Sequence, residues 1–250
     1  MSVTALFGRT ARDHRAALGD RPLRGTRWWV GGPRDREARL RGAPGGFDPE
    51  VVPLGEELRS LWHRFGDGRA VVGSRAVALV LRRLLDAEPE RWPSFAAIPD
   101  RADAARTLAA IDRALSLRRA LPADGELHDL RGALREAVAA IDGVREGDAL
   151  EGLLERVGSP GLTRALASAP RLWIDEPIGG GPLLAEVVAT LATAAGAAGV
   201  EVVVLCASGR DEGGREVASL LGWEAADRAG RVFAATAPLR RALLERVGTG

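Results

Sequence analysis

Two parts of the chain repeat a short apolar segment followed by a helical pattern, and this alternation restricts the folds open to the chain. The apolar segments are "VTALFG" (3–8), "RWWV" (27–30), "EVVP" (50–53), "RLWID" (171–175), "VEVVVLCAS" (200–208) and "RVFAAT" (231–236). Apolar strands that show no polar alternation are typical of a parallel sheet buried on both faces by helices. We therefore predict an α/β fold with a parallel sheet.

The region between these two parts has a different pattern. Residues 69–168 show helical periodicity only, in segments separated by Pro or Gly, and Ser74 is the expected N-cap of the first helix. We therefore predict a discontinuous α/β domain, formed by residues 1–68 and 169–250. An all-helical domain of residues 69–168 is expected to be inserted between its third and fourth strands.

Several residue types are missing, and their absence excludes some chemistry. The chain has no Lys, Asn, Gln or Tyr, and all 35 basic residues are Arg. Schiff-base chemistry, a phosphate-binding lysine and acid–base catalysis by Tyr are therefore excluded. The formal net charge is only +1, so any contact with a polyanion must come from a local patch.

The single cysteine and three histidines argue against a metal or disulfide framework. Cys206 lies in an apolar run and is expected to fill the core, while His14, His63 and His128 have no second ligand at metal spacing. No signal-peptide pattern and no run of eighteen apolar residues is present. We therefore expect a cytoplasmic protein without membrane contact.

The first strand–turn–helix junction, "FGRTARDHR" (7–15), is where a phosphate-binding loop would lie. Such a loop needs the pattern G-x-x-x-x-G-K-[ST], and this junction has one glycine and no lysine. Gly8, Arg9 and Thr10 can still receive an anion at a helix N-terminus, or they form only a turn. We expect neither ATP nor Mg²⁺ as a cofactor of this chain.

The segment "RLWIDEP" ends in two carboxylates, Asp175 and Glu176. Two interpretations are open. In one, these acids bind Mg²⁺ and orient a water molecule, and they are then weak catalytic candidates. In the other, they form a structural strand end, with Asp175 capping the turn and Glu176 solvated.

The segment "GGPRDREAR" (31–39) is the second candidate for ligand contact. Gly31 and Gly32 allow close approach of a partner to the backbone, and Arg34, Arg36 and Arg39 lie near the start of one helix. Arginine suits two-point contacts with phosphate, which makes this segment a candidate DNA contact. The alternative is a solvated helix face on which Asp35 and Glu37 pair with the arginines.

In the order of its segments, the chain resembles the N-terminal part of AddB-like subunits of bacterial helicase–nucleases, in the PD-(D/E)XK nuclease superfamily. The resemblance covers nearly all 250 residues. It is carried by "TRWWVGGPRDREARLRG", "DPEVVPLGEELRSLW", "AVVGSRAVALVLRRLLDAE", "FAAIPDRADAARTLAAIDRALSLRRA", "RLWIDEPIGGGPLLAEVVATLA" and "RVFAATAPLRRALLERVG".

This resemblance implies a P-loop-NTPase-like, helicase 1A-like first domain with a degenerate Walker A loop. It implies a DNA-binding scaffold in double-strand-break repair and recombination, which holds single-stranded DNA or DNA ends beside a helicase–nuclease partner subunit. The family's exonuclease domain and its iron–sulfur cysteines have no counterpart in these residues. We therefore expect either a fragment of a longer protein or a shortened relative.

Two other functions remain open from the sequence. The first is a nucleotide hydrolase with an unorthodox phosphate loop, in which Asp175 binds Mg²⁺ and Arg9 replaces the lysine. The second is a protein-interaction scaffold without a DNA role, in which an exposed stripe of the helical domain binds a partner.

Overall fold

The structure is a computed structural model that describes residues 3–8, 18–19, 21–42, 49–118, 122–175, 181–207, 224–225 and 232–234. The chain forms two compact units, residues 1–61 with 156–250, and residues 62–155. The boundaries predicted from the sequence, after residues 68 and 168, lie later in the chain than those of the two units.

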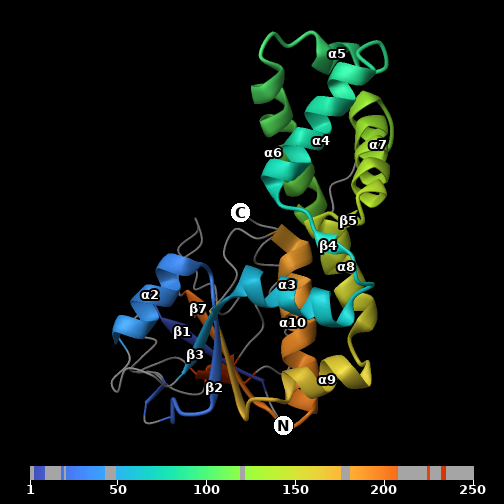
Figure 1. The fold of residues 1–250 in the computed structure, drawn as a ribbon. Helices are drawn as coiled ribbons and strands as arrows, with labels where there is room; N and C mark the ends of the chain where they lie inside the picture. Colours follow the sequence, from blue (N-terminus) through green and yellow to red (C-terminus); the bar gives the residue numbers. More distant parts are fainter. Residues whose placement is uncertain are drawn as a thin grey trace. The chain divides into compact units, whose positions relative to one another are not determined.

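The first unit contains a sheet with the strand order β3-β2-β6-β7-β1-β9-β8 (Figure 1). The strands are β1 (Val3–Gly8), β2 (Thr26–Val30), β3 (Glu50–Pro53), β6 (Arg171–Asp175), β7 (Glu201–Ala207), β8 (Glu224–Ala225) and β9 (Val232–Ala234). Neighbouring strands from β3 to β1 are parallel, whereas β9 is antiparallel to β1 and to β8. The predicted α/β class is confirmed, and the sheet is mostly parallel, with antiparallel strands β9 and β8 at one edge.

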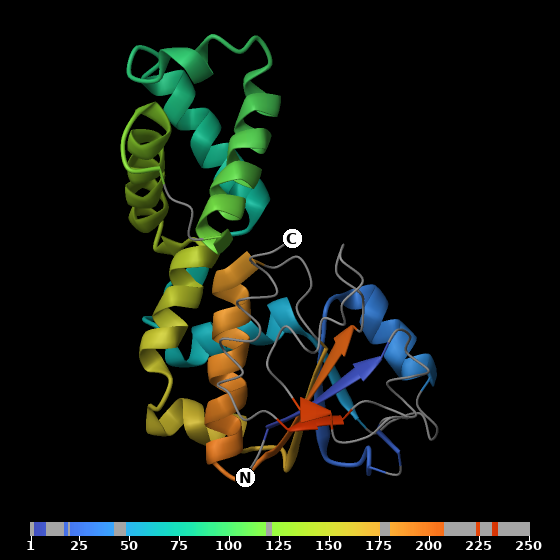
Figure 2. The same cartoon turned by 180° about the vertical axis from the view of Figure 1, so that it is seen from behind.

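Helices α2 (Pro33–Gly42) and α10 (Gly181–Ala197) connect strands on opposite faces of this sheet. Figures 1 and 2 view the unit from opposite sides, and both show α2 and α10 on different sides of the strands. The step from β2 to β3 and the step from β6 to β7 run in opposite directions along the sheet. Because such crossovers are right-handed, opposite directions place their helices on opposite faces.

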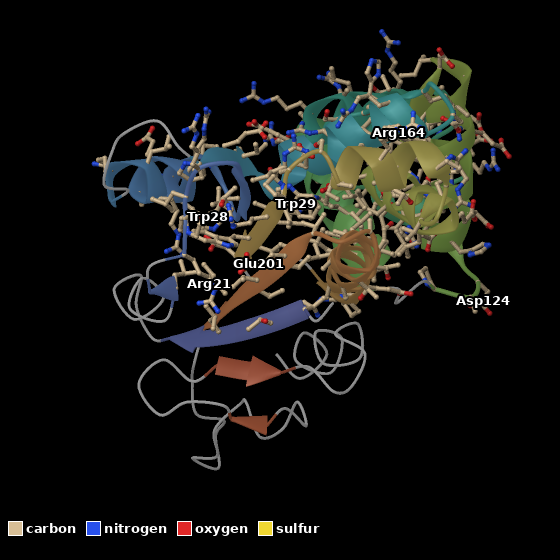
Figure 3. All side chains as sticks on the ribbon, turned by 90° about the horizontal axis from the view of Figure 1, so that it is seen from below. Arg21, Trp28, Trp29, Asp124, Arg164 and Glu201 are labelled. Atoms are coloured by element: carbon tan, nitrogen blue, oxygen red, sulfur yellow. The ribbon has the colours of Figure 1, made fainter. Side chains whose placement is uncertain are left out.

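Aromatic and branched side chains fill the core of the first unit. On the face that carries α2, one cluster contains Leu6, Leu18, Trp28, Val30, Val51, Trp173, Val203 and Leu205. Trp29 alternates with Trp28 along β2 and therefore lies on the opposite face, as the labelled side chains of Figure 3 show. All five tryptophans in the part of the chain whose burial is described are buried, as predicted for most of them; Trp223 lies outside the described residues.

The second unit is mainly helical, with α4 (Ser74–Ala87), α5 (Pro93–Ala96), α6 (Arg101–Arg118), α7 (Glu126–Ala140) and most of α8 (Glu146–Arg156). Its core is formed by Val77, Ala78, Leu81, Leu85, Trp92, Ala105, Leu108, Ala109, Leu130, Ala133, Leu134 and Val138. The two remaining helices are α3 (Leu54–Phe65), which extends across the boundary of the units, and α9 (Pro160–Leu166) in the first unit. None of the helices in the described ranges is long and apolar enough to span a bilayer.

Two details of this region differ from the prediction. The pattern of helices only is wrong, because β4 (Ala70–Val71) and β5 (Gly143–Val144) form a two-stranded parallel sheet. Each strand has two residues, which is too short for any sequence period to appear. Ser74 is the first residue of α4 and not its N-cap, a position taken by Gly73 without a side-chain capping bond.

Candidate functional site at the carboxyl edge of the sheet

The strand order places two of the candidate segments beside each other. Strands β2 and β6 are parallel neighbours, with Trp28 opposite Trp173 and Trp29 opposite Ile174. The chain continues from β2 and from β6 in opposite directions along the sheet, so a topological switch point lies between them. In open α/β sheets, ligands bind outside the carboxyl ends of the strands at such a point. This edge carries Gly31 after β2 and Asp175 at the end of β6.

Both carboxylate oxygens of Asp175 accept hydrogen bonds from Arg39 of α2. Arg39 Nη2 donates to Oδ1 at 3.0 Å, and Arg39 Nε donates to Oδ2 at 3.2 Å. The Arg39 side chain is 15% exposed and the Asp175 side chain is 14% exposed. A two-point arginine–carboxylate contact that is largely shielded from water is stronger than a surface ion pair.

Two tryptophans complete this arrangement, which we call the Asp175 cluster (Trp28, Arg39, Trp173 and Asp175). Trp28 Nε1 donates to Asp175 Oδ1 at 3.0 Å, and the Arg39 guanidinium lies 4.8 Å from the centre of the Trp28 ring. Trp173 meets Trp28 edge to face, with ring centres 5.2 Å apart and an interplanar angle of 80°. The Trp28 ring therefore contacts the cation while its N–H supports the anion.

This geometry bears on the two interpretations of Asp175. A magnesium ion at this carboxylate would have to displace the guanidinium that engages both oxygens. The cluster favours the structural interpretation, with Asp175 as a paired strand end. Glu176 lies outside the described residues. Across the described ranges, no group of three or more His, Cys, Asp or Glu side chains could hold a metal ion.

Helix α2 begins directly after the two glycines. Gly32 O accepts the first helical hydrogen bond from Arg36 N at 2.9 Å, so Gly31 and Gly32 precede the helix. The Asp35 carboxylate turns back toward Gly31, where an added β-carbon would lie 2.9 Å from Asp35 Oδ2. An acid in the first turn is favourable because the helix N-terminus carries partial positive charge.

Arg34 and Arg36 are exposed on α2. Within the described part of the chain, neither guanidinium group has a hydrogen-bond or ion-pair partner. The alternative interpretation had Asp35 and Glu37 pair with these arginines, but in the structure Glu37 pairs with Arg41 at 3.6 Å and Asp35 faces Gly31. Two exposed guanidinium groups thus lie on the helix that follows β2, at the carboxyl edge of the sheet.

The third candidate segment is described only in part. Gly8 is the last residue of β1 and pairs in register with Ala207 of β7, while Arg9 and Thr10 lie outside the described residues. Strand β7 separates β1 from β6, so the ends of β1 and β6 share one edge at a distance of roughly 10 Å. The fold thus brings Gly8, Gly31, Gly32 and Asp175 to the same edge.

Sequence reasoning named Arg39 as a possible phosphate contact but missed that it pairs with Asp175. It also missed Trp28 as the donor to that acid. Trp28 and Asp175 are 147 residues apart in the sequence, and no local pattern indicates which strands become neighbours. An alternating-face argument could have placed Trp28, Trp173 and Asp175 on one face, given the strand pairing.

Sequence reasoning also missed a largely buried network of charged side chains in the second unit. Asp112 of α6 accepts hydrogen bonds from Arg131 Nε at 2.6 Å and from Arg145 Nη1 at 2.9 Å. Arg145 also donates to both oxygens of Asp148, at 2.8 and 3.1 Å, and Arg135 donates to the same acid at 3.1 Å. The signal for it was an acid, Asp112, within the apolar stripe of α6.

Burial and ion pairing act in opposite directions on this network. Burial alone would raise the pKa of Asp148, but the hydrogen bond and charge of Arg145, together with Arg135, hold that pKa below its ordinary value of 3.8. Burial would lower the pKa of Arg145, yet the hydrogen bond that it donates to Asp148 and the charges of Asp112 and Asp148 raise that pKa. Both groups are therefore held in their charged forms.

Comparison with models of known protein families and with curated protein sequences gave no match for this chain.

Proposed function

We propose that this chain is a catalytically degenerate, helicase-like module of an enzyme that processes DNA double-strand breaks. In this proposal it is not catalytic by itself. It binds single-stranded DNA or DNA ends and acts as a scaffold beside a helicase–nuclease partner subunit. The proposed contacts are Arg34 and Arg36, with the backbone at Gly31 and Gly32 close to the phosphates.

One observation carries the proposal. The carboxylate that would serve a nucleotide-bound metal is engaged by Arg39 and Trp28, while Arg34 and Arg36 on the same helix are exposed. An exposed arginine beside two glycines is suited to phosphate, because the guanidinium donates two parallel hydrogen bonds and the backbone leaves room for approach. These features favour polyanion binding over nucleotide hydrolysis.

The test is a titration of fluorescent single-stranded and forked DNA, followed by anisotropy at several salt concentrations. Binding should weaken as salt rises, because phosphate contacts release counterions. The double variant Arg34→Ala/Arg36→Ala should reduce the salt slope by about 1.4, since each contact to single-stranded DNA contributes about 0.7. The matched control is Arg106→Ala, an exposed arginine of α6 whose side chain pairs with Asp103.

The control should leave the salt slope unchanged. Flat titrations of the unaltered chain against both DNAs at low salt would contradict the proposal. If the double variant and the control changed the salt slope equally, Arg34 and Arg36 would not be the DNA contacts.

A further inference from the structure

Helix α2 has little apolar contact with the unit that carries it. Among residues 33–41, only Arg39 and Leu40 are not exposed, and Leu40 packs against the core cluster that contains Trp28. The helix has ten residues, and an isolated helix of this length is marginal in water. A helix that is polar on nearly all sides must be held by specific contacts, so its few buried contacts determine where it lies.

Arg39 makes these contacts with two different strands. Its guanidinium donates to Asp175 at the end of β6 and lies over the Trp28 ring of β2. A two-point hydrogen bond fixes the plane of the guanidinium, and the ring contact fixes that plane against the sheet. Together with Leu40, these contacts define the rotation of α2 about its own axis.

We infer that Asp175 is a positioning residue, which holds α2 against the ends of β2 and β6 and thereby sets the direction of Arg34 and Arg36. The acid at the end of β6 then acts on a polyanionic ligand through Arg39, without touching the ligand. The effect on DNA rests on the proposed function, whereas the effect on α2 does not depend on any ligand.

The direction in which one substitution changes DNA affinity distinguishes this positioning role from a simple effect of charge. Asp175→Asn removes a negative charge near the proposed phosphates and releases the cation of Arg39, so charge alone predicts tighter DNA binding. Positioning predicts weaker binding, because α2 loses the contact that orients its arginines. Asn can still accept a hydrogen bond from Trp28, and it keeps the shape of the side chain.

The binding experiment compares the unaltered chain with Asp175→Asn and Arg39→Lys at low salt, by anisotropy with single-stranded DNA. We expect Asp175→Asn to weaken binding about fivefold, which is less than the roughly tenfold or more for direct loss of a charge-assisted contact, because Asp175 acts on the DNA only through Arg39. The DNA affinity of Arg39→Lys should lie between those of the unaltered chain and Asp175→Asn, since Lys provides a point charge without the planar two-point contact. The matched control is Glu37→Gln, which removes an exposed acid from the same helix and should strengthen binding slightly.

Hydrogen exchange of backbone amides, measured without DNA, tests the inference independently. Asp175→Asn and Arg39→Lys should both speed exchange in α2, while α10 on the other face should exchange as in the unaltered chain. Faster exchange in α2 of a chain that binds no DNA would support positioning and refute the proposed function. Unchanged exchange in both variants would overturn the inference, whether or not the chain binds DNA. If the unaltered chain binds DNA, equal or tighter binding by Asp175→Asn would also overturn the inference while leaving the proposed function standing.

Discussion

Arg145 and Asp112 form an ion pair at 2.9 Å in which both side chains are less than a tenth exposed. The pair joins the segment before α8 to the middle of α6, and Arg131 of α7 donates to the same carboxylate. One acid thus connects α6, α7 and the segment that leads into α8.

Asp112→Ala should lower the free energy of unfolding by about 3–5 kcal/mol, because Arg131 and Arg145 lose a shared buried acceptor. The control Asp103→Ala lies on the same helix, where its pair with Arg106 is exposed, and should cost about 0.5 kcal/mol. Urea unfolding followed by far-UV circular dichroism measures both. A similar loss of unfolding free energy in the two variants would show that the buried ion pairs of Asp112 do not stabilise the fold.

Stability of the second unit should fall on acidification below pH 3.8 because of Asp148. Its folded pKa is lower than its ordinary value of 3.8, so its ionised form contributes stability above that pH. This contribution is lost as the pH falls through the folded pKa. Thermal unfolding between pH 5 and pH 2 should show a smaller acid-induced drop in Tm for Asp148→Asn than for the unaltered chain. Parallel curves would contradict the assignment.

Trp28→Phe should destabilise the first unit more than Trp29→Phe. Both substitutions remove similar volume from the core, but only Trp28 donates an indole N–H to a carboxylate. Within the described residues, Trp29 Nε1 has no hydrogen-bond partner. The difference in the free energy of unfolding should be about 1.5–3 kcal/mol, the usual contribution of a hydrogen bond to a charged group. Equal costs would mean that the Trp28–Asp175 bond is not stabilising.

Gly143→Ala and Gly132→Ala should change stability in opposite directions. A β-carbon on Gly143 would collide with Val72 Cγ2 and approach Val138 O to 3.0 Å, so we expect a loss of about 1–3 kcal/mol. Gly132 lies inside α7 with nothing within 4 Å of the added carbon, so alanine there should stabilise by about 0.5–1 kcal/mol. Chemical denaturation of the two variants provides the measurement.

ATP turnover should not exceed background and should not depend on Asp175. The chain has no lysine to bind a triphosphate, and the Arg39 guanidinium engages both oxygens of the candidate acid. Phosphate release, measured with and without Mg²⁺, should be the same for the unaltered chain and Asp175→Ala. Turnover that disappears in the variant would instead favour the nucleotide-hydrolase interpretation.

The order of strands and helices was predictable because burial on both faces leaves a local mark, as in "VEVVVLCAS" and "RLWID". The arrangement of the site was not, because it depends on which strands pair. Nothing near Asp175 in the sequence indicates Trp28 or Arg39, which approach it only when β2 and β6 become neighbours. The antiparallel β9 was missed for the same reason.

The candidate site residues fall into two groups with different predictability. The exposed arginines of α2 could be identified from the sequence, since charge and the preceding glycines are local properties. Whether each arginine is paired could not, because Arg39 and Arg34 look alike until the helix packs against the sheet. In the second unit, Asp112 was detectable as a charge within an apolar stripe, but its two arginine partners were not.

The neighbours of β1 in the sheet, β7 and β9, come from the far end of the described chain. At synthesis rates of about 5–20 residues per second, the first strand leaves the ribosome roughly 10–40 seconds before β7 exists to pair with it. The hydrophobic core cluster of the second unit lies within residues 77–138, which are contiguous and complete well before that time. Translation therefore gives the helical core an opportunity to form while the sheet still has an unpaired apolar strand, and a chaperone acting on the nascent chain would find its target in β1.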